Sequence, residues 1–332
     1  MNIAISSDSG IDLNKETLTR YDIRTIPFEI LLGNDNRYDG EVASKEITDF
    51  VAKTKTLPKT GAINVYRFEE HFKNLLSDYD AVIHFSMSSE VSSACKNAIE
   101  AAKKFNNVYV VDTRSLSTGI ALLAIYAREL ACRNFLPAQI IEKCKSRIDK
   151  LQVSTIIARL DYLYKGGRCS ALQLFGANVL KLRIQIVVKN GKLSPAKKYR
   201  GSMDSCVEKY INDTLETYNN PDLSRAFITA TSIDASIIEK AKNTLLKRGF
   251  KEVIVTEAGG AVTSHAGENA LGVLYLNDGE PENVPALKPH GLIERIKRGY
   301  KPVIGTLLSV EWLKINSTAG FHIVDKLSFT NA

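Results

Sequence analysis

Among the five histidines of this 332-residue chain, His265 has the sequence context most typical of a ligand-binding side chain. It lies in the run Ala261–Gly272, where Ser264 and Gly267 favour a turn just before an apolar stretch. An imidazole can donate a hydrogen bond to a carboxylate in either protonation state, and a positive charge strengthens that bond. His265 is therefore a candidate anion ligand, with a satisfied structural histidine as the competing interpretation.

Four serines form a second candidate group, namely Ser88, Ser89, Ser92 and Ser93. They follow an apolar stretch typical of a strand and precede a helical pattern. Their hydroxyls and the free backbone N–H groups of a helix start can converge on an anion. Ordinary N-capping, for which serine is also favoured, explains the same pattern.

Thr60 is a third candidate, because it stands between Pro58-Lys59 and Gly61 on a predicted connection. The glycine would allow a ligand to approach the backbone closely. An ordinary turn threonine is the alternative.

A hydrolase would use the same residue types, with Ser92 as nucleophile and His265 as base. The chain contains no G-x-S-x-G elbow, and no acidic residue is marked by its spacing as the third member of a triad. Triad members need only meet in space, so a lipid esterase or thioesterase stays open as an alternative. Neither a phosphate-binding G-x-x-x-x-G-K-[ST] loop nor the glycine loop of protein kinases occurs.

The elements that must position these residues follow an α/β pattern. Short β-rich runs alternate with helical ones in the first part of the chain, which predicts a parallel sheet covered by helices. Strands are expected at 2–6, 23–32, 81–86 and 108–112, and helices at 45–55, 68–77, 93–105 and 115–133. The helix at 115–133 is apolar enough to line a tunnel or to be a core helix.

The second part of the chain predicts a different, mixed sheet. Asn190-Gly191 is typical of a hairpin turn between strands at 184–188 and 193–196. Two helix-to-strand units follow, at about 205–231 and 234–257. We therefore expect two α/β domains, 1–150 with the candidate binding loops and 151–332, which includes an unassigned extension from about 280. A ligand site between them is the usual α/β arrangement.

The overall composition is that of a cytoplasmic protein, with 44% hydrophobic and 24% charged residues. No apolar run approaches the roughly 20 residues needed to cross a bilayer, and no secretory leader is recognisable. The five cysteines lack C-x-x-C spacing, which predicts neither a zinc site nor disulfides. No metal or cofactor is expected.

The formal charge of +7 is concentrated in one segment. Residues 162–203 contain nine lysines and arginines and no acidic residue. The segment is either a solvated face or a surface that attracts phosphate, an acidic protein or an anionic lipid headgroup. Nucleic acid is not expected, because no DNA- or RNA-binding signature accompanies the charge.

Six motifs, taken in order, resemble the DegV family of fatty-acid-binding proteins. They are Ser7-Asp8-Ser9-Gly10-Ile11-Asp12-Leu13, Lys59-Thr60-Gly61, the run 85–93, Val111-Asp112-Thr113-Arg114-Ser115, the run 162–170, and Ala261–Gly272. The resemblance covers most of the chain up to Gly272 and implies a two-domain DegV-like fold. It also implies that Thr60, Ser92 and His265 bind a fatty acid carboxylate, with Gly61 and Ser93 beside them.

The chain departs from the family pattern at both loops. Ser93-Ala94-Cys95 stands where the family usually has Gly-Thr-Tyr, which changes the loop geometry and leaves Ser92 in place. Gly61, Ile63 and Asn64 replace a serine, a proline and a serine after Thr60, which changes the additional loop contacts.

The family resemblance further implies a protein that is not itself an enzyme. It would bury the tail of a long-chain fatty acid and present the carboxyl end to a separate dihydroxyacetone-kinase-like fatty acid kinase, which yields a bound acyl phosphate used in bacterial phospholipid metabolism. Arg168 would pair with phosphate or carboxylate, unless it forms a structural salt bridge. Arg200 is the candidate for kinase docking. A transient contact with a membrane surface and a non-catalytic lipid-sensing role are also compatible with the sequence.

Overall fold

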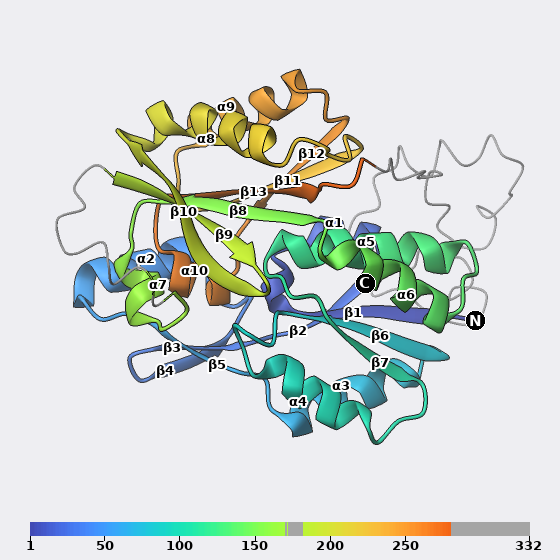
Figure 1. Ribbon diagram of the computed structural model, residues 1–332. Coiled ribbons are helices and arrows are strands. Elements are labelled where there is room, and N and C mark those ends of the chain that lie inside the picture. The colour runs from blue at the N-terminus through green and yellow to red at the C-terminus, as the bar shows by residue number, and fades with distance from the viewer. Residues whose placement is uncertain (170, 172–181, 280–332) are drawn as a thin grey trace, which may run out of the picture. The chain divides into compact units, whose positions relative to one another are not determined.

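The computed structural model describes residues 1–169, 171 and 182–279, and these belong to one compact unit. The extension from about 280 lies outside the described residues. The described chain is an α/β protein built on one parallel sheet, one mixed sheet and a small antiparallel sheet (Figure 1). The predicted fold class is confirmed, whereas the domain boundary near residue 150 stays a prediction.

The parallel sheet has the order β2-β1-β6-β7. Its strands are β1 (Ile3–Asp8), β2 (Ile23–Ile26), β6 (Ala81–Ser86) and β7 (Val108–Asp112). Helices α3 (Val65–Leu76) and α4 (Ala94–Ala102) cover one face, and α5 (Thr118–Cys132) and α6 (Pro137–Ile148) the other (Figure 1). Both faces being covered explains why every residue of β1 and β6 is buried.

The single strand expected over residues 23–32 is wrong, because the structure divides it between two sheets. Pro27 separates β2 from β3 (Glu29–Leu32), and a proline cannot donate a ladder hydrogen bond. Strand β3 lies between β4 (Asp35–Tyr38) and β5 (Lys59–Gly61) in the small antiparallel sheet. The short helices η1 (Ser9–Ile11) and α1 (Lys15–Arg20) follow β1, and α2 (Ser44–Thr54) precedes β5.

The mixed sheet has the order β10-β9-β8-β13-β11-β12, in which only β11 and β12 are parallel neighbours. Its strands are β8 (Leu151–Ile157), β9 (Leu182–Lys189), β10 (Lys192–Arg200), β11 (Arg225–Thr231), β12 (Glu252–Glu257) and β13 (Ala270–Leu276). Helices α8 (Met203–Thr217) and α9 (Ala235–Lys247) cover its outer face (Figure 1). Asn190 and Gly191 have φ of 52° and 81°, the backbone that the predicted tight hairpin turn requires.

Helix α5 joins the two sheets through one shared core. Its side chains from Thr118 to Leu130 are buried almost without exception, and the same cluster includes Val153, Phe227 and Leu274 of the mixed sheet. A helix that is apolar all round is buried on all sides. Of the two interpretations of this segment, the core helix is the one that the structure shows.

A buried polar network lies between the parallel sheet and α3. The Ser6 hydroxyl is 2.8 Å from His71 Nε2 and 3.1 Å from His84 Nδ1, and Phe68 and Phe72 pack edge-on against His84. Burial lowers the pKa of His71 to about 4, helped by the positive charge of Arg67, and lowers the pKa of His84 well below its ordinary value. Both imidazoles are therefore neutral at neutral pH.

We expect this network to make the protein less stable in mild acid. Between about pH 6.5 and 4 the unfolded chain takes up protons that folded His71 does not, so the free energy of unfolding falls as pH falls, by at most about 3 kcal/mol for this group. Burial raises the pKa of Asp8 to about 7, and this group makes the free energy of unfolding rise as pH falls. The contribution of His71 is therefore measured by comparing the wild type with a His71 variant. Urea unfolding across this pH range should show a shallower loss for His71→Gln than for the wild type. Equal slopes would contradict the assignment.

Candidate functional site

A cavity of about 360 Å³ is lined by both the mixed sheet and the loops at the carboxyl ends of the parallel strands. This volume falls within the range of roughly 300–1,000 Å³ typical of small-molecule pockets. Most of its wall is apolar, including Met87, Val91, Leu116, Ile157, Ile186 and Leu274. The cavity therefore suits a largely apolar ligand.

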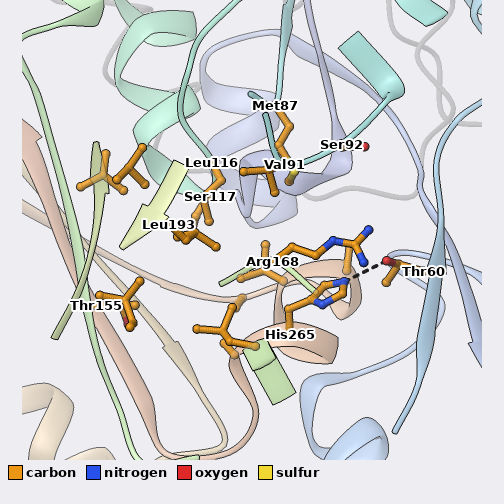
Figure 2. A pocket seen from close by; sticks show the side chains of 18 of the residues that line it. Thr60, Met87, Val91, Ser92, Leu116, Ser117, Thr155, Arg168, Leu193 and His265 are labelled. Atoms are coloured by element: carbon orange, nitrogen blue, oxygen red, sulfur yellow. Dashed lines mark hydrogen bonds between the residues drawn. The ribbon is translucent and has the colours of Figure 1, made fainter. Parts of the chain in front are cut away.

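The polar side chains that the sequence marked as candidates lie on one side of this cavity (Figure 2). Figure 2 shows Thr60, His265, Arg168 and Ser92 on one side of the pocket and Thr155 on the opposite side. Thr60 Oγ1 and His265 Nε2 are 2.9 Å apart, although 205 positions separate them in the sequence. The structure thus brings together the hydroxyl, imidazole and guanidinium groups that the sequence marked separately.

The backbone around Thr60 and His265 differs from the expectation. Thr60 lies on strand β5, paired with Ile30 of β3, and not on a free connection. His265 lies in the last turn of helix α10 (Gly260–Ala266) and not on a turn. Gly267, with φ of 72°, ends that helix, so the small residues around His265 are cap residues of a short helix.

His265 is a neutral donor in this site. Burial, together with the nearby positive charge of Arg168, lowers its pKa to about 4. Its Nδ1 atom is buried and has no hydrogen-bond partner among the described residues. A buried N–H without a partner is costly, which favours the tautomer with the proton on Nε2. His265 then donates to Thr60 Oγ1, and the Thr60 hydroxyl proton is free for a ligand.

The Lys165-Gly166-Gly167-Arg168 motif lies against this imidazole. Gly166 comes directly after helix α7 (Asp161–Lys165), and a Cβ atom there would be 2.5 Å from His265 Nδ1. Only glycine allows the two segments to come this close. Arg168 is partly buried, and one of its NH groups donates to the Gly166 carbonyl at 2.7 Å. No salt bridge joins it to an acid within the described ranges, so the structural-pair alternative is not what the structure shows.

Two serine hydroxyls of the run 88–93 donate hydrogen bonds within the protein, whereas the hydroxyl of Ser92 only accepts one. Ser88 donates to the Gly191 carbonyl at 2.7 Å, and Ser89 donates to Asp112 at 2.6 Å. Ser92 accepts a hydrogen bond from the Ala94 N–H at 3.2 Å, which leaves its own proton free. Both Ser92 and Ser93 line the pocket, as does Gly61. Ser93 is the N-cap residue of α4 and its side chain makes no capping hydrogen bond, whereas Ser92 accepts from the first residue of the helix and keeps its own proton.

Ser92 and His265 are not arranged as a hydrolase pair in the part of the chain that the structure describes. His265 Nε2 contacts Thr60, and no hydrogen bond joins the imidazole to Ser92.

Across residues 1–169, 171 and 182–279, no group of histidine, cysteine or acidic side chains could hold a metal ion. No helix within the same ranges is long and apolar enough to span a bilayer.

Arg200 lies away from the pocket lining. It is exposed at the end of the edge strand β10, and its side chain makes no hydrogen bond or ion pair with described residues. Other charges of the acid-free segment pair with acids from elsewhere: Lys192 is 3.3 Å from Glu90, and Lys197 is 3.7 Å from Asp213. Part of the positive charge of residues 162–203 is therefore compensated by acidic side chains that lie close to it in the fold.

Several pocket residues had no sequence-based prediction. Lys96 lines the pocket from the first turn of α4. Val153, Ser154, Thr155 and Ile157 line the cavity from β8. Three of them alternate along the strand, and this period of two is the signal in the sequence that marks one face of a sheet.

Comparisons with known proteins agree with this geometry. The sequence profile of the DegV family of uncharacterised proteins matches residues 2–278. A fatty acid-binding protein of Thermotoga maritima is 30% identical over 286 residues, which cover 82% of this chain and 96% of that protein.

Solved structures share the fold. A DegV lipid-binding protein of Thermotoga maritima has a TM-score of 0.73 at 28% identity, over 83% of this chain and 98% of the other. A DegV family protein of Thermus thermophilus, described by its fatty acid binding, has a TM-score of 0.77 at 24% identity, over 83% and 99%. The fold, the extent of the profile match and the level of identity agree, and the chain belongs to the DegV family.

Proposed function

We propose that this protein binds a long-chain fatty acid, with the tail in the apolar cavity and the carboxylate at Thr60, Ser92 and His265. The observation that carries the proposal is the 2.9 Å Thr60–His265 pair on one side of a mostly apolar cavity of about 360 Å³. The fatty acid-binding relative supports the choice of ligand. Gly61 and Ser93 border the same side of the cavity, and Arg168 supplies its positive charge.

The chemistry of this side suits an anion that must later be modified. Thr60 and Ser92 each offer a hydroxyl proton, and neutral His265 orients the Thr60 hydroxyl, so these three side chains hold the carboxylate without adding a positive charge. Tail burial contributes most of the affinity, at ~0.8 kcal/mol for each methylene group. The carboxylate therefore stays a competent nucleophile at the pocket mouth.

The proposal includes a separate ATP-dependent, dihydroxyacetone-kinase-like fatty acid kinase as partner. A carboxylate oxygen of the bound ligand attacks the γ-phosphorus of ATP, ADP leaves, and an acyl phosphate remains in the pocket. In this proposal the kinase supplies the catalytic residues of that step. Use of ATP implies a cytoplasmic location, and loading implies transient contact with a membrane surface.

Arg200 is the proposed kinase contact, and its charge reversal tests it. We expect Arg200→Glu to raise the KM of the kinase for the fatty-acid-loaded protein by at least about tenfold, because a favourable contact with an acidic surface becomes repulsive. Fatty acid binding should be unchanged, since Arg200 does not line the pocket.

The matched control for this experiment is Lys247→Glu, an equal change of charge at the end of α9. Kinase kinetics with both variants, measured with ATP and protein carrying the same fatty acid, separate docking from net charge. Equal KM values for Arg200→Glu and the wild type would remove Arg200 from the interface.

Fatty acid binding itself is tested by titration of lipid-free protein with a long-chain fatty acid and with the alcohol of the same chain. Both ligands fill the cavity, but only the acid offers a carboxylate to Thr60, Ser92 and His265. The proposal predicts clear selectivity for the acid. Equal affinity for the two ligands would show that the polar end is not a carboxylate site.

A further inference from the structure

The Ser7–Leu13 motif is not part of the pocket wall, yet its two acids lie directly behind the carboxylate site. Asp8, at the end of β1, is fully buried. Its Oδ2 atom accepts a hydrogen bond from the Met87 N–H at 2.7 Å and one from the Ser86 hydroxyl at 3.1 Å. These residues begin the loop that leads to Ser92. Asp8 therefore fixes the start of that loop.

The second acid of the motif, Asp12, holds the start of the helix that carries His265. Asp12 Oδ1 accepts from the Gly259 N–H at 2.8 Å, and its Oδ2 accepts from the Ser117 hydroxyl at 2.6 Å. Ser117 in turn lines the pocket next to the start of α5. Asp12 is 3% exposed, so this contact is shielded from water.

Asp39 also accepts a hydrogen bond from the start of α10, one residue after the Asp12 contact. Its Oδ1 accepts from the Gly260 N–H at 2.6 Å, and its Oδ2 accepts from the Ser9 hydroxyl of the same motif at 2.7 Å. A serine could cap a helix with less desolvation. An aspartate side chain has a second oxygen, with which it also ties the helix start to another segment. The use of two buried carboxylates on one short helix therefore favours a role in fixing its position.

The glycine at the helix start fits closely between these acids. A Cβ atom on Gly259 would be 3.0 Å from Asp39 Oδ1 and 3.2 Å from Asp12 Oδ1, which is too close for the carboxylates to keep their positions. Because α10 has only seven residues, displacement of its first turn must also displace His265 in its last.

We propose that Asp8, Asp12 and Asp39 are positioning residues for the carboxylate site, with Asp8 setting the Ser92 loop and Asp12 and Asp39 setting the helix of His265. The inference rests on the proposed function and adds residues that touch no ligand. It also gives the Ser7–Leu13 motif a role. This segment at the end of β1 positions both the loop of Ser92 and the helix of His265, which come from distant parts of the chain.

The test compares the wild type with Asp12→Ala, Asp39→Ala and Gly259→Ala. For each protein, the Kd values for a long-chain fatty acid and for the alcohol of equal chain are measured, and the pKa of His265 is followed by NMR. We expect the affinity for the acid to fall about tenfold, equivalent to about 1.4 kcal/mol, and the affinity for the alcohol to be unchanged. We also expect the pKa of His265 to rise from about 4 toward its ordinary value of 6.5. Asp12→Asn, which keeps an acceptor for Gly259, should restore most of the acid affinity.

The matched control is Asp234→Ala, which removes the carboxylate cap of α9, a helix outside the site. It should lower Tm without changing either Kd or the pKa of His265. Equal losses for acid and alcohol, or no change in the His265 pKa in Asp12→Ala and Asp39→Ala, would overturn the inference. A wild type without preference for the acid would instead refute the proposed function, and the His265 titration would still decide whether Asp12 and Asp39 position the imidazole.

Discussion

Thr60→Val combined with Ser92→Ala is expected to weaken binding of a long-chain fatty acid at least about a hundredfold. Each hydroxyl is expected to donate a hydrogen bond to the carboxylate, and bonds to charged groups contribute roughly 1.5–3 kcal/mol apiece. Thr60→Val also leaves His265 Nε2 without its partner at 2.9 Å. Isothermal titration with lipid-free protein measures the loss.

Ser89→Ala is the control for the double variant. Ser89 lines the same pocket, but its hydroxyl already donates to Asp112, so it has no proton for the ligand. Its removal should leave selectivity for the acid over the alcohol intact. Wild-type affinity in the double variant would mean that the carboxylate binds elsewhere.

Filling the far end of the cavity should have the second large effect. Thr155 lies on β8 between Ile186 of β9 and Gly272 of β13, and Figure 2 places it across the pocket from Thr60 and His265. In Thr155→Phe, the phenylalanine ring would occupy the part of the cavity where we expect the end of the fatty acid tail. Each displaced methylene costs ~0.8 kcal/mol, or about fourfold in affinity. We therefore expect the longest chains to bind more than tenfold more weakly, and the preferred chain length to shorten.

A series of saturated fatty acids of increasing length, titrated into Thr155→Phe, Thr155→Val and the wild type, measures this shift. Valine keeps the shape of threonine and should leave the order of chain lengths unchanged. If Thr155→Phe still preferred the same chain length as the wild type, the tail would not reach β8.

Much of the fold could be predicted because local signals agree with the tertiary structure. Strands β6 and β7 have the predicted bounds, and the Asn190-Gly191 turn forms the predicted hairpin. Helix α6 also carries a readable signal, with Pro137 at its start and Ile140, Cys144 and Ile148 spaced by four residues, although no helix was predicted there.

The backbone around the site could not be predicted from local patterns. Thr60 becomes a strand residue only because β3 lies beside it, and that pairing is not visible in the three residues of β5. His265 lies on a helix whose start is held by Asp12 and Asp39, more than 200 positions away. Ser264 and Gly267 suggest a turn unless those distant carboxylates are known. The sequence could therefore mark side chains that line the pocket, but not the contacts that orient them.

The claim that this protein carries a fatty acid is tested most directly by mass spectrometry of the organic extract from natively purified protein. The same extract from Thr60→Val/Ser92→Ala protein, prepared identically, is the comparison. We predict a fatty acid in a stoichiometric amount in the wild type and little in the double variant. A wild-type protein that is empty and also fails to take up added fatty acid would contradict the account.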